Sequence, residues 1–167
     1  MQLNNKIDTW IFDLDNTLYS ADSGIFQQVH KLMGKFIVEH LNVNINEAKT
    51  IQRKYYKKHA DSILDKLQIA NLFEGIFDIR MANYIPKPEI QTYEKLIETY
   101  NINSNKTIMF DDIAKNLVPA SKIGFTTVWI DVGHENFSDD IASSKKYLDY
   151  QTKDLSNWLS NINMRST

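Results

Sequence analysis

Residues 10–18 read Trp-Ile-Phe-Asp-Leu-Asp-Asn-Thr-Leu, an apolar stretch that runs directly into two carboxylates. Its first part lies within residues 9–14, which are short, aromatic and aliphatic and end in turn-forming residues, so we predict a buried strand there. Asp13 and Asp15 are two positions apart, at the point where this strand ends. An Asp-x-Asp after a strand is by itself more often only a turn signal, so the rest of the chain decides its meaning.

Two further apolar stretches end in acidic residues in the same way. Residues 107–112 read Thr-Ile-Met-Phe-Asp-Asp, and residues 126–131 read Thr-Thr-Val-Trp-Ile-Asp. Both are predicted strands, and the spacing of apolar residues predicts helices over 89–100 and 113–123. Strands that alternate with helices form right-handed βαβ units around a parallel sheet. The predicted fold class is therefore α/β.

The remaining elements are predicted from the same periodicities. Helices are expected over 23–42, about 46–58, about 60–70 and 154–162, with short strands over 76–79 and 146–150. The first two of these helices interrupt the alternation directly after the first strand, so we interpret them as a reduced helical cap inserted over the site. The predicted domains are an α/β core of residues 1–20 and 60–167, and a cap of residues 21–59.

The composition excludes several classes of function. The chain has 167 residues, of which 43% are hydrophobic and 24% charged, and these are ordinary values for a globular domain. A net charge of −2 provides no basic field for nucleic acid or an acidic membrane. The absence of cysteines excludes disulfides, thiolate metal sites and a cysteine nucleophile. Because no apolar run reaches the roughly 18 residues of a membrane helix and the N-terminus does not resemble a signal peptide, we expect a cytoplasmic protein.

The acidic residues after the predicted strands suit a metal ion. Ligands of parallel sheets bind at the carboxyl ends of the strands, and Asp13, Asp111, Asp112 and Asp131 lie at or near such ends. Mg²⁺ prefers hard oxygen ligands, usually one or two carboxylates together with water and substrate phosphate. Asp13 and one member of the Asp111–Asp112 pair are candidates to supply them from neighbouring strands.

The same residues suit phosphoryl transfer. Asp13 beside a metal could form an aspartyl-phosphate as the nucleophile, while Asp15 could protonate the leaving alkoxide and then activate water. Lys87 stands in a Pro-Lys-Pro turn at residues 86–88. A lysine ammonium there would neutralise the charge of the phosphate and of the nucleophile.

Taken together, these segments resemble the haloacid dehalogenase superfamily of phosphohydrolases, and within it the pyrimidine 5′-nucleotidase-like branch. The resemblance rests on residues 12–19, 71–79 with 86–88, and 110–117, and on 23–26 and 53–56 in the predicted cap helices. It covers nearly the whole chain. It implies a Rossmann-like parallel sheet flanked by helices, with a helical cap after the first strand, and it places Asn116 where it would orient the loop below the site.

The resemblance also implies a role for each matching residue. Asp13 would be the nucleophile and Asp15 the general acid and base. Mg²⁺ would be held by the Asp13 carboxylate, the backbone carbonyl of Asp15 and Asp112, with Asp111 helping directly or through water. Lys87 would bind the phosphate.

One motif of the family is missing from this chain. The family carries an apolar strand that ends in Thr or Ser between the cap and the lysine, and its hydroxyl and backbone N–H groups hold the phosphate. No segment of residues 20–85 has this pattern, and Ser20 and Ser62 are the hydroxyls that could substitute. We therefore interpret the chain as having an internal deletion of this strand and part of the cap. Removing a single preorganised donor can cost about 2.7–4 kcal/mol of transition-state stabilisation.

Three functions stay open on the sequence. The first is a Mg²⁺-dependent phosphomonoester hydrolase that acts on a small phosphorylated metabolite, with nucleotides among the candidates, and has no nucleic acid or membrane partner. The second is a catalytically impaired relative that binds metal or a partner without efficient turnover. The third is a helical interaction module built on the exposed cap face, which predicts self-association. The exact substrate and the oligomeric state do not follow from the sequence.

Overall fold

The computed structural model describes residues 7–18, 35, 38, 41, 43–48, 70–133 and 142–162. The chain divides into two compact units, one of residues 1–20 with 85–167 and the other of residues 21–84. The second unit therefore extends to Tyr84, whereas the predicted cap ends at residue 59. The predicted boundary after residue 59 lies outside the described residues, so the division into core and cap stays a prediction.

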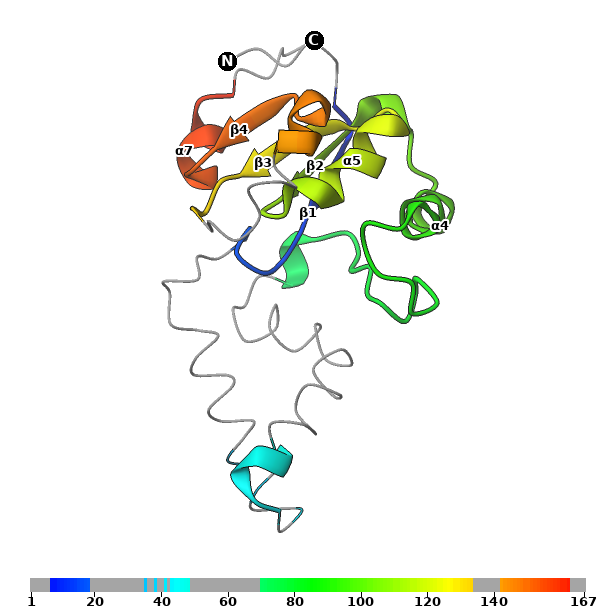
Figure 1. The fold of residues 1–167 in the computed structure, drawn as a ribbon. Helices are drawn as coiled ribbons and strands as arrows, with labels where there is room; N and C mark the ends of the chain where they lie inside the picture. Colours follow the sequence, from blue (N-terminus) through cyan, green and yellow to red (C-terminus); the bar gives the residue numbers. More distant parts are fainter. Residues whose placement is uncertain are drawn as a thin grey trace. The chain divides into compact units, whose positions relative to one another are not determined.

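A parallel sheet of four strands forms the centre of the first unit (Figure 1). Its strands are β1 (Thr9–Phe12), β2 (Thr107–Asp111), β3 (Thr126–Ile130) and β4 (Tyr150–Thr152), hydrogen-bonded in that order. All three neighbouring pairs are parallel. Because the register pairs Phe12 with Phe110 and Asp111 with Trp129, the carboxyl ends of these strands meet at one edge. The predicted α/β class is confirmed.

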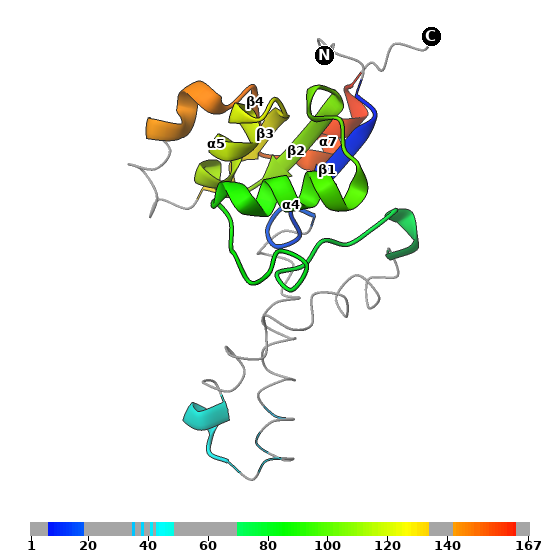
Figure 2. The ribbon, with the colours of Figure 1, turned by 90° about the vertical axis from the view of Figure 1, so that its right-hand side faces the viewer.

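Helices flank this sheet on both faces. The helices α4 (Ile90–Tyr100) and α5 (Ala114–Lys122) pack on one face, and the short helix α7 (Leu155–Ser160) packs on the other (Figure 2). A turn with positive φ at Gly124 (φ 100°) follows α5 and leads into β3, as expected of a glycine after a helix end. Among the described residues no helix is long and apolar enough to cross a bilayer.

Two apolar cores result from the alternation of side chains along the strands. Met109 of β2 packs with Tyr93 of α4 and Leu117 of α5. Phe110, the next residue, packs with Trp158 of α7, and their rings meet edge to face with centroids 5.3 Å apart. All five residues of β2 are buried, so the strand that ends in the acidic pair is held on both faces.

The first strand is less enclosed than the second. All four residues of β1 are partly exposed. Among the residues that the structure describes, β1 pairs with β2 alone and no strand lies on its other side. A strand ending in Thr or Ser, as the family carries, would pair with β1 there. Residues 49–69 lie outside the described part of the chain, so the internal deletion stays a prediction.

The last predicted strand lies later in the chain than expected. The strand is predicted over residues 146–150, but the first residues of that range lie in the 3-10 helix η5 (Lys145–Tyr147), and β4 begins at Tyr150. The reason is a set of side-chain contacts with β3. The Thr127 hydroxyl donates to the carbonyl of Tyr147 at 2.8 Å, and the Asp149 carboxylate accepts from the Thr127 N–H at 2.8 Å. These bonds hold the loop in place before β4 starts.

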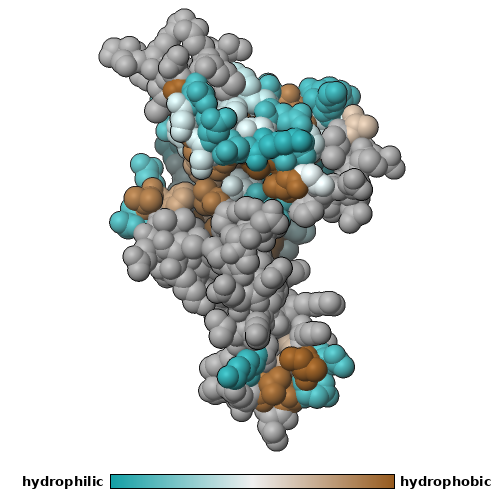
Figure 3. Space-filling view, turned by 90° about the vertical axis from the view of Figure 1, so that its left-hand side faces the viewer, coloured by the Kyte–Doolittle hydropathy of each residue, from teal (hydrophilic) through white to brown (hydrophobic). Residues whose placement is uncertain are grey.

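In the second unit, the helices predicted over 23–42, 46–58 and 60–70 lie mostly outside the described residues. Residues 45–48 are helical, and Asn44 caps their start. Its side chain accepts from the N–H groups of Asn46 and Glu47, while the Glu47 carboxylate accepts from the Asn44 N–H. This reciprocal arrangement is a capping box. Ile45 of this segment is 53% exposed, and Figure 3 shows hydrophobic surface on the segment.

The strand predicted over residues 76–79 is wrong. Among the described residues this stretch pairs with no strand, and turns follow from Ile79 to Tyr84. The Asp78 carboxylate accepts from the N–H groups of Arg80 and Met81 and forms an ion pair with the Arg80 guanidinium. An aspartate that binds nearby backbone N–H groups in this way competes with strand pairing.

Candidate functional site

Four of the predicted site residues converge at the carboxyl edge of the sheet. Asp13 follows β1, Asp111 ends β2, and Asp112 comes directly after it. The Nζ atom of Lys87 lies 2.7 Å from Oδ1 of Asp13 and 2.5 Å from Oδ2 of Asp111. Lys87 lies in the loop before α4. It thus contacts two carboxylates, of Asp13 and Asp111, that are 74 and 24 positions away in the chain.

Asp111 is completely buried and makes four contacts with donors. Its Oδ1 accepts from the backbone N–H of Ile113 at 2.9 Å and from the side-chain amide of Asn116 at 3.0 Å. Its Oδ2 accepts from Lys87 at 2.5 Å and from the same Asn116 amide at 3.2 Å. An ionised carboxylate offers about four lone-pair positions, so these contacts saturate Asp111. Its role in this arrangement is to anchor Lys87.

Tyr93 supports this anchor from α4. Its hydroxyl donates to the backbone carbonyl of Asn116 at 2.5 Å, and the tyrosine is only 1% exposed. Burial raises the pKa of Tyr93 above its ordinary value, so the hydroxyl stays protonated as a donor. The sequence does not indicate this role, because the helical spacing of an aromatic residue gives no sign of where its hydroxyl binds.

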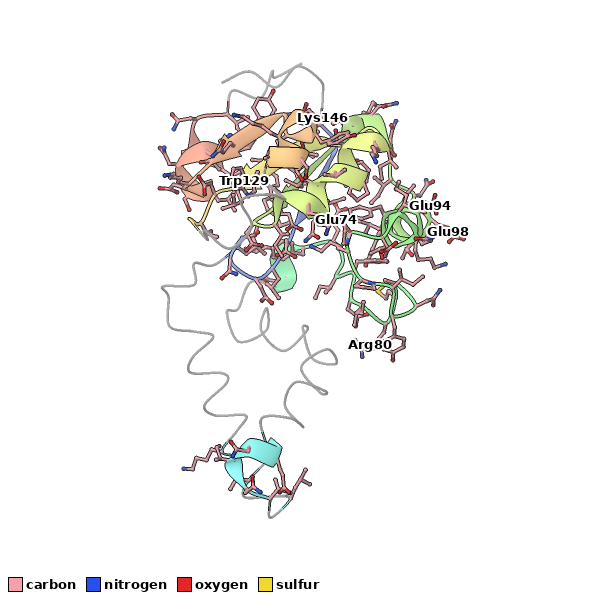
Figure 4. The ribbon with its side chains drawn as sticks, in the orientation of Figure 1. Glu74, Arg80, Glu94, Glu98, Trp129 and Lys146 are labelled. Carbon is pink, nitrogen blue, oxygen red and sulfur yellow. The ribbon has the colours of Figure 1, made fainter. Side chains whose placement is uncertain are left out.

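Asp112 is held at both its side chain and its backbone. Its Oδ2 accepts from the side-chain amide of Asn16 at 3.2 Å. Its backbone carbonyl accepts from the indole N–H of Trp129 at 2.9 Å, and Figure 4 labels this tryptophan on β3. The ring of Trp129 is buried in the core, and nothing in the sequence indicates the hydrogen bond of its indole N–H. Asn16, which follows β1, and Trp129, which lies in β3, therefore hold Asp112 from both sides.

The donor set of the site fits Mg²⁺. Asp13, Asp111 and Asp112 each place one carboxylate oxygen within 4.8 Å of the other two, and hard oxygen donors are what this ion prefers. Because donors saturate Asp111, Asp13 and Asp112 are the better candidates to hold the ion. The three carboxylates and the Lys87 ammonium together carry two net negative charges when ionised, which a divalent cation would offset.

The pKa values of these groups reflect burial and mutual charge. Burial raises the pKa of Asp111 to about 6, with Lys87 opposing the shift and Asp13 adding to it. Burial and the charge of Asp13 also raise the pKa of Asp112. For Lys87, burial favours the neutral amine, but the charges of Asp111 and Asp13 outweigh it and raise its pKa well above the ordinary range. Lys87 is therefore an ammonium ion at neutral pH.

Asp15 and Asp131 are not members of this carboxylate group. Asp15 is partly buried in the turn after β1. The resemblance assigns its backbone carbonyl to the metal and its carboxyl to proton transfer, and both roles stay predictions. The Asp131 carboxylate accepts from the N–H of Gly133 and from the side chain of Gln151, each at 3.1 Å. Asp131 thus belongs to the loop after β3.

A family model matches the middle of the chain. Residues 50–130 match the model of the haloacid dehalogenase-like hydrolases, and this segment contains Lys87 and the Asp111–Asp112 pair. Over this segment the chain is similar to the haloacid dehalogenase-like hydrolases. The match agrees with the predicted superfamily over residues 50–130, and the pyrimidine 5′-nucleotidase-like branch within it stays a prediction. No curated protein matches the sequence.

Solved structures of a candidate phosphatase, a haloacid dehalogenase-like family protein and a dehalogenase share the fold. A candidate phosphatase from Clostridium difficile aligns over 94% of this chain and 99% of its own, with a TM-score of 0.60 and 15% identity. A haloacid dehalogenase-like family protein from Streptococcus pneumoniae aligns over 92% and 97%, with a TM-score of 0.58 and 17% identity. A dehalogenase aligns over 95% and 98%, with a TM-score of 0.57 and 15% identity. At these identities the likeness establishes the fold.

Proposed function

We propose that this protein is a Mg²⁺-dependent hydrolase of phosphate monoesters. The observation that supports this most is the convergence of Asp13, Lys87 and the Asp111–Asp112 pair at one edge of the sheet. A carboxylate nucleophile, an ammonium and further carboxylates for a cation are then all within reach of one small ligand. The resemblance to the pyrimidine 5′-nucleotidase-like branch makes small phosphorylated metabolites, with nucleotides among them, the first substrates to test.

The charge of the site supports a substrate that arrives together with a divalent cation. A phosphate monoester is a dianion near neutral pH, and a site with two net negative charges would repel it. Mg²⁺, when bound, supplies Lewis-acid polarisation and charge neutralisation for the phosphoryl oxygens. The residues that would hold it are Asp13, Asp112 and the backbone carbonyl of Asp15. Lys87 stays an ammonium beside them and binds a phosphoryl oxygen.

Each carboxylate then has a separate task. A carboxylate oxygen of Asp13 attacks phosphorus, the bond from phosphorus to the ester oxygen breaks, and an aspartyl-phosphate forms. Asp15 gives its proton to the departing alkoxide. It then takes a proton from the water that attacks phosphorus, which releases inorganic phosphate and regenerates Asp13. Asp111 keeps Lys87 in place throughout.

Hydrolysis of p-nitrophenyl phosphate tests this function. We expect Mg²⁺-dependent release of p-nitrophenol by the wild type and its loss to background in Asp13→Asn. Asp131→Asn is the matched control, because Asp131 also follows a strand of the sheet but lies outside the carboxylate group. Its rate should equal that of the wild type. Equal rates for the wild type and Asp13→Asn would exclude the proposed nucleophile.

A catalytically impaired relative is the second candidate, and the absence of the family's Thr or Ser motif from residues 20–85 of the sequence favours it. Within the described residues β1 has a neighbouring strand on one side alone, so no described strand brings a Thr or Ser hydroxyl to the phosphate. A protein of this kind would bind Mg²⁺ through Asp13 and Asp112 without turning over a phosphate ester. Calorimetric Mg²⁺ binding by a wild type that does not hydrolyse p-nitrophenyl phosphate would support this alternative.

A further inference from the structure

Asn16 connects the loop after β1 to Asp112 after β2. Its side-chain nitrogen Nδ2 lies 3.2 Å from Oδ2 of Asp112, a residue 96 positions later. The direction of this bond follows from the partner, because an ionised carboxylate only accepts hydrogen bonds. The contact therefore leaves Asn16 as the donor and occupies one oxygen of Asp112.

The backbone of Asn16 is in the left-handed conformation, with φ of 59°. This conformation costs most residues about 1–2 kcal/mol, and asparagine is one of the few that adopt it with any frequency. Glycine would adopt it at lower cost. An asparagine at this position therefore adds what glycine lacks, a side-chain amide that reaches the acidic pair.

The Asp112 carboxylate needs such a contact if it is to have a fixed orientation at the cation site. The indole of Trp129 fixes its backbone carbonyl, but this bond does not hold the carboxylate itself. The amide of Asn16 holds it by binding Oδ2. The Asp112 carboxylate then has a defined orientation beside the Asp13 carboxylate, with which it shares the 4.8 Å carboxylate group.

We propose that Asn16 is a positioning residue for the divalent cation, because it holds the Asp112 carboxylate in the orientation that completes a cation site with Asp13. This inference rests on the proposed metal binding and adds a residue to it. Removal of a partner that orients a metal-ligating carboxylate typically weakens metal affinity about 10–100-fold. Asn16→Gly removes the amide and keeps the left-handed turn, so its Kd for Mg²⁺ should rise by about tenfold or more.

Asn101→Gly is the matched control. Asn101 ends α4 and has φ of 51°, close to that of Asn16. The same substitution in the same backbone conformation thus removes an asparagine that the site does not use. The experiment is a calorimetric titration of the full chain with Mg²⁺, together with thermal unfolding in the presence and absence of Mg²⁺.

We expect Asn101→Gly to bind Mg²⁺ like the wild type and Asn16→Gly to bind it more weakly. The metal-free unfolding temperature of Asn16→Gly should be equal to or above that of the wild type, and its increase on adding Mg²⁺ should be smaller. A merely structural asparagine would give the opposite result, a lower metal-free unfolding temperature with unchanged Mg²⁺ affinity.

Three outcomes would overturn the role of Asn16, and they are distinguishable. Equal Mg²⁺ affinity in Asn16→Gly and the wild type would exclude positioning by Asn16 and leave the proposed metal site standing. A metal-free unfolding temperature of Asn16→Gly far below that of Asn101→Gly would assign Asn16 to the fold. Absence of Mg²⁺ binding by the wild type would remove the metal site itself, and the role of Asn16 with it.

Discussion

The ammonium nitrogen of Lys87 lies 2.5 Å from Oδ2 of Asp111, whose side chain is fully buried. Removing one partner of a buried ion pair leaves an uncompensated charge, which is far more costly than losing an exposed pair. Because burial already raises the pKa of Asp111, this carboxyl can escape the cost by taking up a proton. The stability of the site should therefore depend on pH once the lysine is gone.

Lys87→Met should destabilise the metal-free protein by about 3–5 kcal/mol near pH 8 and by less near pH 5. Without the lysine, the folded-state pKa of Asp111 rises further above its unfolded value of about 3.9. The folded state then binds more protons than the unfolded state, so stability falls as the pH rises towards the folded pKa and recovers as the pH is lowered. Urea unfolding at the two pH values measures the difference.

Lys106→Met is the control for this substitution. Lys106 and Asp8 form an ion pair at 3.1 Å in which both side chains are 47% exposed, and exposed pairs are typically worth about 0–1 kcal/mol. Its loss of stability should be small and similar at both pH values. A loss in Lys87→Met that is the same at pH 5 and pH 8 would contradict the idea that Asp111 becomes an unpaired buried charge.

Trp129→Phe should weaken Mg²⁺ binding as well as stability. The indole N–H donates to the carbonyl of Asp112 at 2.9 Å, and phenylalanine keeps an aromatic ring but has no donor. The Asp112 peptide would then be free to shift, which moves the carboxylate relative to Asp13. We expect a severalfold increase in the Kd for Mg²⁺, measured by calorimetry, together with a smaller loss in the free energy of unfolding.

Trp158→Phe is the control that distinguishes a loss of core packing from a loss of the bond that positions Asp112. Trp158 and Trp129 are each 8% exposed, but Trp158 packs on the opposite face of the sheet, against Phe110. Both substitutions remove part of a buried ring and should lower stability by a similar amount. The affinity for Mg²⁺ should change in Trp129→Phe alone. A matching loss of affinity in Trp158→Phe would show that the effect comes from general loosening of the sheet.

The sequence was sufficient to predict the parallel sheet and the edge at which its acids gather. Residues 107–111 are continuously apolar up to the aspartate and are flanked by helical periodicities, and the rule that ligands bind at the carboxyl ends of parallel strands places Asp13 and Asp111 at one edge. Lys87 was a candidate from its Pro-Lys-Pro turn and from the family resemblance, but its position beside these acids depends on how a loop crosses that edge. The structure confirms that these three side chains meet.

The supporting hydrogen bonds could not be predicted from local pattern. Tyr93 and Trp129 are aromatic residues at ordinary core positions, and their polar atoms bind backbone carbonyls 23 and 17 residues away. Nothing in helical or strand spacing indicates such a partner. The strand predicted over 76–79 is wrong for a local reason. Asp78 binds backbone N–H groups within its own turn, and the short apolar run around it does not indicate that these bonds compete with strand pairing.

The affinity for Mg²⁺ should fall as the pH is lowered through about 6. Burial raises the pKa of Asp111 to about 6, and burial with the charge of Asp13 raises that of Asp112. Asp112 must lose its proton to hold a hard cation, and a proton on Asp111 removes a negative charge beside the ion, so protons oppose metal binding in this range. Calorimetric titrations at pH 5.5 and 7.5, each in two buffers of different ionisation enthalpy, measure both the affinity and the protons released.

We expect weaker binding with proton release at pH 5.5 and tighter binding with almost none at pH 7.5, because the carboxyls are already ionised there. Equal affinity at the two pH values, with no protons released at either, would show that the acidic cluster does not bind the ion through these carboxylates.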